Sequence, residues 1–313
     1  MALHHNTTQQ HASTSPAATA QSTAKSSETN QSILTLDPHT RHTGLLVTKP
    51  IGHWLLEAKA RPMPQQLLSE FWFEEELYIL FADSNVGKSI LAMQIGNSIS
   101  QGVPIPGFAL GVGAQKILYC DFELSDKQLE VRYSATNEEQ YPFVTDNFLR
   151  AEITPDPTLP PHCSFEAYLY DSLKKVLVQS QAKVLIIDNL TYLKNETEKA
   201  NHALTLMKQL QKLKKQYQLS ILALAHTPKR DFSRPISCND LQGSKMLMNF
   251  CDSAFSIGRS QQDTGLRYLK QIKARNVEVM YGVDHVCLCE IVKPTNFLHF
   301  RFLDYTTEQL HLR

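Results

Sequence analysis

The stretch FADSNVGKSILAMQIG, residues 81–96, decides the fold of this chain. Residues 77–81 before it are apolar and rich in strand formers, and residues 89–100 after it repeat apolar side chains at helical spacing. Strand, loop and helix in this order are typical of a phosphate-binding loop, with Ala82 where the pattern has its first Gly. The alternative is a turn that reads Gly-Lys-Ser by chance, which the flanks disfavour. The predicted nucleotide-binding segment consists of Ala82, Asp83, Ser84, Asn85, Val86, Gly87, Lys88, Ser89 and Ile90.

The chemistry of this segment suits a triphosphate, which carries several negative charges. Backbone N–H groups of the loop and the positive end of the following helix supply fixed partial charges. Gly87 lets the backbone approach where a side chain would collide. Lys88 can reach the β and γ oxygens, and the Ser89 hydroxyl can bind Mg²⁺. We therefore expect ATP and Mg²⁺ as ligands.

Composition and charge limit the classes of function. The 313 residues are 42% hydrophobic and 20% charged with a net charge of zero, which predicts a globular protein whose binding to nucleic acid would need a local patch. No signal peptide or long apolar run is visible, so we expect a cytoplasmic protein with no membrane partner. Cys287 and Cys289 lie in an apolar alternation, which favours a packed strand over a metal site.

Three segments of different composition follow one another. Residues 1–43 lack aromatic side chains and are dominated by small polar residues, which predicts a disordered tail. Residues 44–76 carry Trp54, Trp72 and several Leu and Phe residues, and we interpret them as an N-terminal segment that covers the core. Residues 77–313 are the predicted ATPase domain.

The order of elements in the third segment predicts its architecture. After the first strand and helix, strands are expected at 116–122, 148–153, 184–188 and 219–225, with helices at 124–133, 165–179 and 200–217. Strands then follow at 254–257, 266–274, 283–291 and 298–302. This order predicts an α/β fold: a mostly parallel twisted sheet with helices on both faces and antiparallel strands at its C-terminal end. Ligands bind at the carboxyl ends of such strands.

Polar residues end several of the predicted strands. Asp188 closes the apolar run 184–187, about 100 residues after the phosphate loop, and can hold the Mg²⁺ shell beside Ser89. Asn189 follows where many other ATPases have a catalytic Glu, so Glu123 is the best candidate for the hydrolytic base. The alternative for Glu123 is a carboxylate at an ordinary helix start. His226 ends another strand, where a polar side chain would face the γ-phosphate.

Lys273 and Arg275 form a basic pair two residues apart. Strand alternation would place both on one face, where like charges repel unless an anion lies between them. A bound phosphate is such an anion, and an arginine supplied by a neighbouring subunit raises phosphoryl-transfer rates by roughly 10³ to 10⁵. The alternative is a solvated strand edge.

Four motifs together resemble the RecA-type core of ring helicases. They are ELSDKQLEVR at 123–132, ALAHTPK at 223–229, DLQGS at 240–244 and IKARN at 272–276. The similarity is to the DnaB group and most of all to the compact RepA-like plasmid replication and mobilisation helicases, over residues 60–295. Ala82 departs from the family pattern, and no primase or collar domain is visible in the chain.

The resemblance implies a role for each matching position. Glu123 would polarise the attacking water, and His226 would sense the γ-phosphate and couple its loss to a DNA-contacting loop. Lys273 and Arg275 would reach the phosphates of the neighbouring subunit, and Arg132 would contact the nucleotide near its base. The loop 229–245 would grip single-stranded DNA through Lys229, Arg230, Arg234 and Lys245.

The expected function is therefore that of an ATP-hydrolysing ring helicase or translocase on single-stranded DNA. The resemblance implies a homo-hexamer, plasmid or mobile-element replication or mobilisation as the setting, and a replication initiator or loader protein as a possible partner. A RecA-fold regulatory ATPase that binds protein partners without unwinding DNA is the main alternative. A small-molecule kinase is the third, although no Arg-rich acceptor lid is evident.

Overall fold

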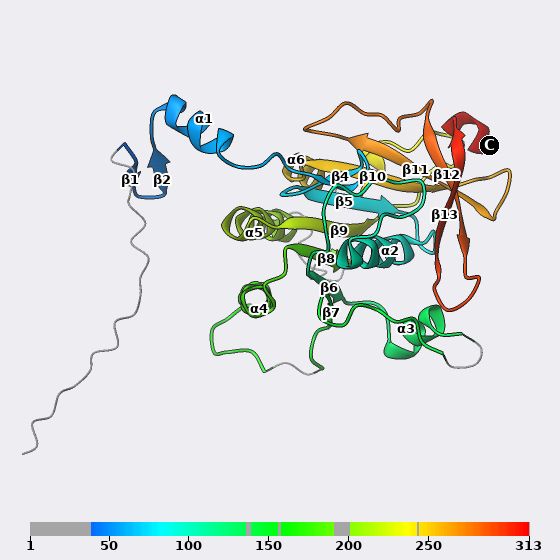
Figure 1. Cartoon of the computed structure of the whole chain (residues 1–313), viewed down its shortest axis with the longest axis horizontal. Coiled ribbons are helices and arrows are strands. Elements are labelled where there is room, and N and C mark those ends of the chain that lie inside the picture. Colours follow the sequence, from blue (N-terminus) through cyan, green and yellow to red (C-terminus); the bar gives the residue numbers. More distant parts are fainter. Residues whose placement is uncertain (1–38, 136–138, 156–157, 191–200, 243, 313) are drawn as a thin grey trace, which may run out of the picture. The chain divides into compact units, whose positions relative to one another are not determined.

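The computed structural model of the chain describes residues 39–135, 139–155, 158–190, 201–242 and 244–312 (Figure 1). The chain divides into two compact units, Met1–Pro62 and Met63–Arg313. Residues 1–38 of the predicted tail lie outside the described residues.

The described part of the first unit is a hairpin followed by a helix. Strand β1 (Arg41–Thr43) pairs antiparallel with β2 (Leu46–Thr48), and Gly44 allows the tight turn with φ of 57°. Helix α1 (Ile51–Lys59) follows directly after Pro50. The predicted tail therefore ends earlier than residue 43, because its last residues pair as a strand.

The second unit is organised by a nine-stranded sheet with the order β13-β12-β11-β10-β5-β9-β8-β6-β7. Strands β10, β5, β9, β8, β6 and β7 are parallel, whereas β10 to β13 pair antiparallel in sequence order. This is the predicted sheet. The bounds are β5 (Leu77–Ala82), β6 (Ile117–Asp121), β7 (Phe148–Ala151), β8 (Val184–Asp188), β9 (Ser220–His226), β10 (Ser253–Arg259), β11 (Leu266–Lys273), β12 (Val286–Val292) and β13 (His299–Thr306).

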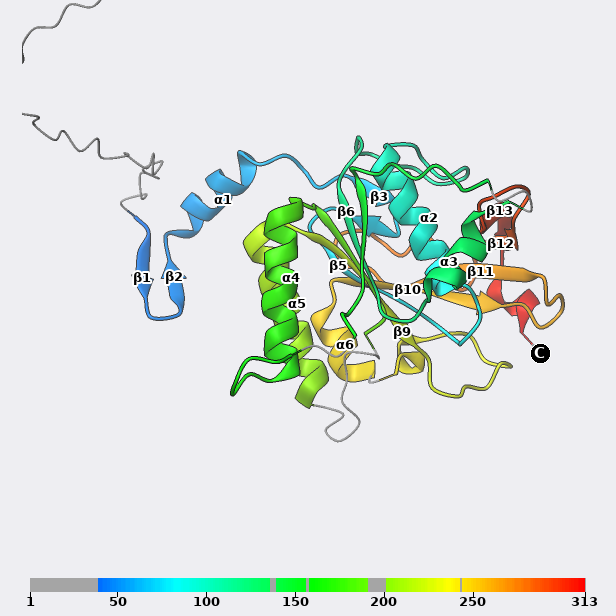
Figure 2. The same cartoon turned by 90° about the horizontal axis from the view of Figure 1, so that it is seen from below.

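Both faces of the central strands are buried, which explains why the interior positions of these strands are apolar. In β5, Tyr78 and Leu80 belong to one core with helix α2 (Lys88–Gln101). Leu77, Ile79 and Phe81 belong to a second core with the remaining helices. Those helices are α4 (Phe165–Ser180), α5 (Asn201–Tyr217) and the shorter α6 (Ser244–Phe250). Figure 2 shows α4 and α5 on the side of the sheet opposite α2.

The antiparallel strands extend the sheet and fold against α2. The Gln94 amide of α2 donates to the Phe300 carbonyl and accepts from the Phe300 N–H, each at 2.9 Å. Cys287 and Cys289 are buried in β12, as their alternation predicted. A short 3-10 helix, Glu308–His311, follows β13.

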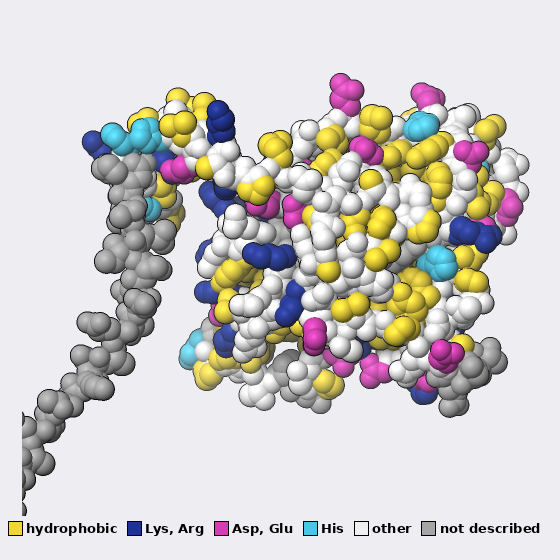
Figure 3. All heavy atoms as spheres, viewed as in Figure 1, with side chains coloured by type: hydrophobic (Ala, Val, Ile, Leu, Met, Phe, Trp, Pro, Cys, Tyr) yellow, Lys and Arg dark blue, Asp and Glu magenta, His cyan; other side chains and the backbone are white. Residues whose placement is uncertain are grey.

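The predicted domain boundary after residue 76 differs from the boundary between the two units. Strands β3 (Gln66–Leu68) and β4 (Trp72–Phe73) lie in the second unit. Phe71 and Trp72 are fully buried in its first core, so residues 63–76 are part of the domain itself. On the face seen in Figure 3, acidic, basic and apolar side chains are mixed over this unit, in keeping with a net charge of zero.

Candidate nucleotide-binding site

The site lies where four neighbouring parallel strands end. Strands β5, β9, β8 and β6 are consecutive in the sheet, Ala82 is in register with His226, and Asp121 is in register with Asp188. Because parallel strands end at one edge, the residues after each strand meet there. The structure therefore brings Lys88, Glu123, Asp188 and His226 together, as the sequence predicted.

The phosphate loop turns sharply into α2. Gly87 is the residue before the helix and has φ of 110°, a conformation that favours glycine. A Cβ at this position would also lie 2.8 Å from the Ile291 side chain and 2.9 Å from the Phe300 ring. Asn85 adopts φ of 60°, which Asn tolerates better than most residues. Backbone geometry and the packing of β12 and β13 thus both require Gly at 87.

Lys88 is buried at the centre of the site. Its Nζ donates to the carbonyls of Ala82 and Asp83 at 3.0 and 3.1 Å and lies 3.2 Å from His226 Nδ1. Burial lowers the pKa of Lys88, although the nearby carboxylates of Asp188, Glu123 and Asp83 oppose the shift. The ammonium therefore lies among acceptors that a triphosphate would replace.

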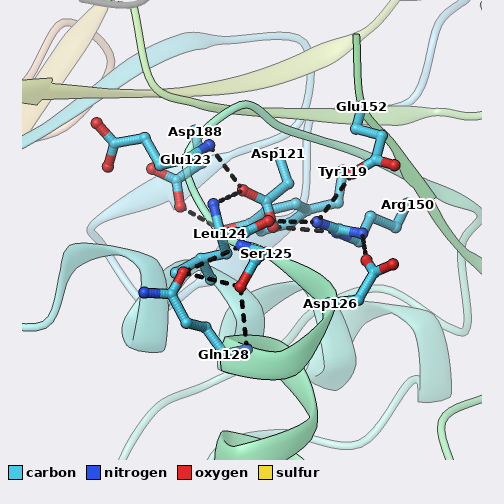
Figure 4. A network of polar contacts seen from close by, with 10 residues as sticks. All are labelled: Tyr119, Asp121, Glu123, Leu124, Ser125, Asp126, Gln128, Arg150, Glu152 and Asp188. Atoms are coloured by element: carbon cyan, nitrogen blue, oxygen red, sulfur yellow. Dashed lines mark hydrogen bonds and ion pairs between the residues drawn. The ribbon is translucent and has the colours of Figure 1, made fainter. Parts of the chain in front are cut away.

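Glu123 is held in a turn between β6 and helix α3 (Asp126–Tyr133). Ser125 caps α3 by accepting from the Gln128 N–H. Asp121 Oδ1 accepts from the N–H groups of Glu123 and Leu124 at 3.2 and 3.0 Å (Figure 4). This turn aims the Glu123 side chain at the carboxyl edge of the sheet.

Arg150, from the edge strand β7, locks the same turn from outside. It donates to Asp121 Oδ2 at 3.0 Å, to Asp126 at 2.8 Å and to the Leu124 carbonyl at 2.7 Å (Figure 4). Sequence reasoning assigned no role to Asp121 or Arg150. The one available signal was the position of Asp121 at the end of a predicted strand.

The Glu123 carboxylate contacts His226 and Asn189. Its Oε1 lies 3.4 Å from His226 Nε2 and accepts from the Asn189 amide. Nδ1 of His226 faces the Lys88 ammonium, and Nε2 lies 3.0 Å from the Asn189 amide nitrogen on the side that faces Glu123. The hydrogen bond with His226 lowers the pKa of Glu123, while burial opposes the shift. Glu123 is thus ionised near neutral pH, as a general base must be.

Asp188 is suited to a divalent cation. The carboxylate is fully buried, and Oδ2 accepts from the Tyr119 hydroxyl at 2.8 Å. Oδ1 has no hydrogen-bond partner among the described residues. Burial raises the pKa of Asp188 to about 6, against the effect of the Ser89 and Tyr119 hydroxyls. A buried carboxylate with an orphaned oxygen beside a hydroxyl fits Mg²⁺, which would restore its charge balance. Asp188 and Ser89 are therefore the residues that would hold the metal.

The comparisons with known proteins agree with this geometry. The profile of the AAA domain family matches residues 49–231, more than half of the 313 residues. The chain belongs to the AAA domain family. Among solved structures, this AAA-domain chain is similar to a KaiC-like protein from the hyperthermophilic archaeon Pyrococcus horikoshii OT3. The TM-score is 0.51 at 12% identity, over 74% of this chain and 91% of that chain, so the likeness concerns the fold. A comparison with curated proteins finds no match.

These findings confirm a RecA-like P-loop ATPase fold with antiparallel C-terminal strands. They support nucleotide binding and hydrolysis by this AAA-domain protein, and the family typically uses Mg²⁺. The match to the family ends at residue 231, so it does not include Lys273 and Arg275. No helix of the described residues is long and apolar enough to cross a membrane.

Two arginines beside the phosphate loop were missed by sequence reasoning. Arg267 Nε donates to the Val86 carbonyl at 3.3 Å, and Arg259 is its cross-strand partner on β10. Burial and the charge of Arg259 lower the pKa of Arg267. Only the pairing of β10 with β11 places these cations there, and the sequence does not reveal that register. Arg132, the predicted base contact, ends α3 and has a buried Nη1 without a hydrogen-bond partner among the described residues.

Lys273 and Arg275 lie at the other end of the sheet. Strand β11 passes Val86 at Arg267 and ends six residues later at Lys273, roughly 20 Å away at about 3.4 Å per residue. Within its own chain, each of the two cations has a separate partner. Lys273 donates to the carbonyls of Met248 and Cys251, and Arg275 donates to the Asp252 carboxylate.

The predicted DNA-contacting loop leaves the site directly after His226. The Gln242 N–H donates to the His226 carbonyl at 3.1 Å, so the loop returns to the residue from which it starts. Lys229 and Arg234 are exposed, and Arg230 stacks over Phe232 with 5.4 Å between guanidinium carbon and ring centre. Lys245 lies in the first turn of α6, and its side chain is outside the described ones.

Proposed function

We propose that this chain is an ATP-driven ring translocase or helicase on single-stranded DNA, of the RepA-like kind, with an active site shared between adjacent copies. The observation that carries the proposal is the position of His226. Its ring contacts Lys88 and Glu123, while the next residues form the exposed basic loop. A change at the nucleotide is therefore three residues along the chain from Lys229, the first cation of a surface suited to a phosphate backbone.

The hydrolytic site uses the residues at the carboxyl edge. Lys88 and the loop N–H groups bind the phosphates, while Ser89 and Asp188 hold Mg²⁺, which supplies neutralisation of phosphate charge. Glu123 accepts the proton of the attacking water, and Asn189 and His226 keep its carboxylate in place. When phosphate draws Lys88 away from His226, the histidine is free to shift, and its backbone moves the loop.

The position of Arg275 supports a shared site. Its side chain is 60% exposed at the edge opposite the phosphate loop of its own chain. An arginine side chain does not span roughly 20 Å along a strand. If Arg275 serves ATP, it serves the ATP of another copy, and head-to-tail contacts of that kind close into rings such as a hexamer.

A RecA-fold regulatory ATPase without unwinding is the second candidate, favoured by the net charge of zero. The test is the rate of ATP hydrolysis by the whole chain with and without single-stranded DNA, with the same length of duplex as control. Stimulation by the single strand supports the translocase. An unchanged rate, with ATP hydrolysed, favours the regulatory ATPase. Strand displacement on a forked duplex then separates helicase from translocase.

A further inference from the structure

Two buried carboxylates hold the segment that carries Arg275. Asp252 precedes β10 and Glu76 precedes β5, at the edge of the sheet opposite the phosphate loop. Asp252 Oδ1 accepts from Arg275 Nη1 at 2.6 Å, and Glu76 Oε1 accepts from the Asn276 amide. The Arg275 N–H also donates to the Ser253 hydroxyl at 3.2 Å. The backbone and the side chains of the turn at residues 275–276 are thus both held by hydrogen bonds.

The fold does not require the Asp252–Arg275 contact. Asp252 is 4% exposed, and its Oδ2 already accepts from the Leu77 N–H at 2.9 Å and from Lys214 Nζ at 2.7 Å. These partners lower the pKa of Asp252 against the effect of burial. Because the Arg275 side chain is largely exposed, solvent screening limits what this ion pair adds to stability. Arg275 is therefore an additional ligand of a carboxylate whose charge is already balanced.

We propose that Asp252 is a positioning residue: it presents the Arg275 guanidinium to the nucleotide bound by an adjacent copy, with the Glu76–Asn276 bond fixing the same turn. This rests on the proposed shared site. Oriented on a buried carboxylate, the planar guanidinium keeps its other N–H groups for an incoming phosphate. An arginine free to rotate would have to lose that freedom in each catalytic cycle.

Asp252→Asn isolates the effect. An asparagine retains one side-chain oxygen, to which the buried Leu77 N–H and Lys214 would donate. Its NH₂ group would then face Arg275, and two donors repel each other. We expect turnover to fall at least about tenfold, since loss of a trans arginine costs roughly 10³ to 10⁵. The Kd for ATP, read by a fluorescent analogue, should stay unchanged because the phosphate loop is untouched. Lys214→Met, which removes the other cation of Asp252, is the matched control and should leave turnover near wild type.

Mixing experiments separate positioning from a merely structural defect. A Lys88→Ala copy lacks a working phosphate loop but offers an intact Arg275, so adding it to Asp252→Asn should raise turnover above the sum of the two. Arg275→Ala offers no arginine, and its mixture with Asp252→Asn should show no gain. If Asp252→Asn fails to assemble, Asn276→Ala, an exposed change on the same turn, should show a smaller fall in turnover with the same mixing pattern.

The reference is the mixture of Lys88→Ala with Arg275→Ala. Suppose that this mixture recovers activity. If Asp252→Asn and Asn276→Ala then behave as wild type, or if they lose activity that added Lys88→Ala does not restore, the positioning role of Asp252 is wrong and the shared site remains supported. If the reference mixture of folded, assembled variants recovers nothing, the shared site itself is wrong.

Discussion

The Lys88 ammonium lies 3.2 Å from Nδ1 of His226, and the other side of the same ring faces Glu123. One side chain thus contacts both the phosphate-binding lysine and the proposed base. His226 is also the last residue of β9, so a displacement of His226 would be passed to the loop that follows.

Replacement of this histidine should uncouple the two functions. In His226→Ala, the phosphate loop keeps its other contacts. The Kd for ATP should therefore rise by at most about fivefold, which corresponds to the loss of one hydrogen bond of ~1 kcal/mol. Stimulation of turnover by single-stranded DNA should disappear. Steady-state hydrolysis with and without DNA measures this, with His42→Ala, an exposed histidine of β1 in the first unit, as the control. Full stimulation in His226→Ala would show that coupling takes another path.

Removal of the proposed base should affect chemistry rather than binding. Glu123→Gln keeps the shape of the side chain but accepts no proton, so kcat should fall by about 10² to 10⁴. Binding of a fluorescent ATP analogue should remain close to wild type. Glu152→Gln is the matched control, because Glu152 is a partly exposed partner of the nearby Arg150. A Glu123→Gln variant that hydrolyses ATP normally would assign the base to another residue.

The basic loop should set the salt dependence of DNA binding. Lys229→Ala and Arg234→Ala should each weaken binding of an oligothymidine and reduce the slope of log K against log salt by about 0.7. Fluorescence anisotropy at several salt concentrations gives the slope. Lys127→Ala removes an equally exposed lysine from α3 and should leave the slope unchanged. Equal slopes for all four proteins would remove the loop from the DNA contact.

Glu76 should make stability depend on pH. Burial raises its pKa from 4.5 to about 7, helped by the charge of Asp252. With a raised pKa in the folded state, the stability linked to its proton is complete below pH 4.5 and is lost as the pH rises through about 7. Glu76→Gln cannot ionise, so its stability relative to wild type should increase between pH 5 and pH 8.

At about 1.4 kcal/mol per unit of pKa, the relative gain is at most about 3 kcal/mol. Urea unfolding at both pH values measures it. Glu75→Gln, at the exposed neighbouring position, should show no such trend. If the stability of Glu76→Gln relative to wild type also stayed constant between pH 5 and pH 8, the buried, uncharged state assigned to Glu76 would be contradicted.

Much of the fold was predictable because strands that are buried on both faces appear in the sequence as apolar runs. The runs 77–81, 184–187 and 221–225 are apolar throughout, and each lies in a central parallel strand. Chain order then places Asp188, Glu123 and His226 at one edge, since parallel strands all end there. These parts of the site followed from local sequence and topology alone.

Contacts between distant strands were not predictable. Arg267 reaches Val86, and Asp252 reaches Arg275, only because of the registers of β10 and β11, which no local pattern specifies. For the same reason the partners of Lys273 and Arg275 within their own chain, two carbonyls and Asp252, could not be predicted. The two short strands before β5, which complete its core, also left no clear pattern in the sequence.

The central claim is that ATP lies between the phosphate loop of one copy and Arg275 of the next. Mass photometry of the whole chain with and without saturating Mg-ATP tests it most directly, since a shared site requires at least two copies. We expect a closed assembly of several chains in Mg-ATP, and its loss in Lys88→Ala. A protein that binds Mg-ATP and remains at the mass of one chain would contradict the account.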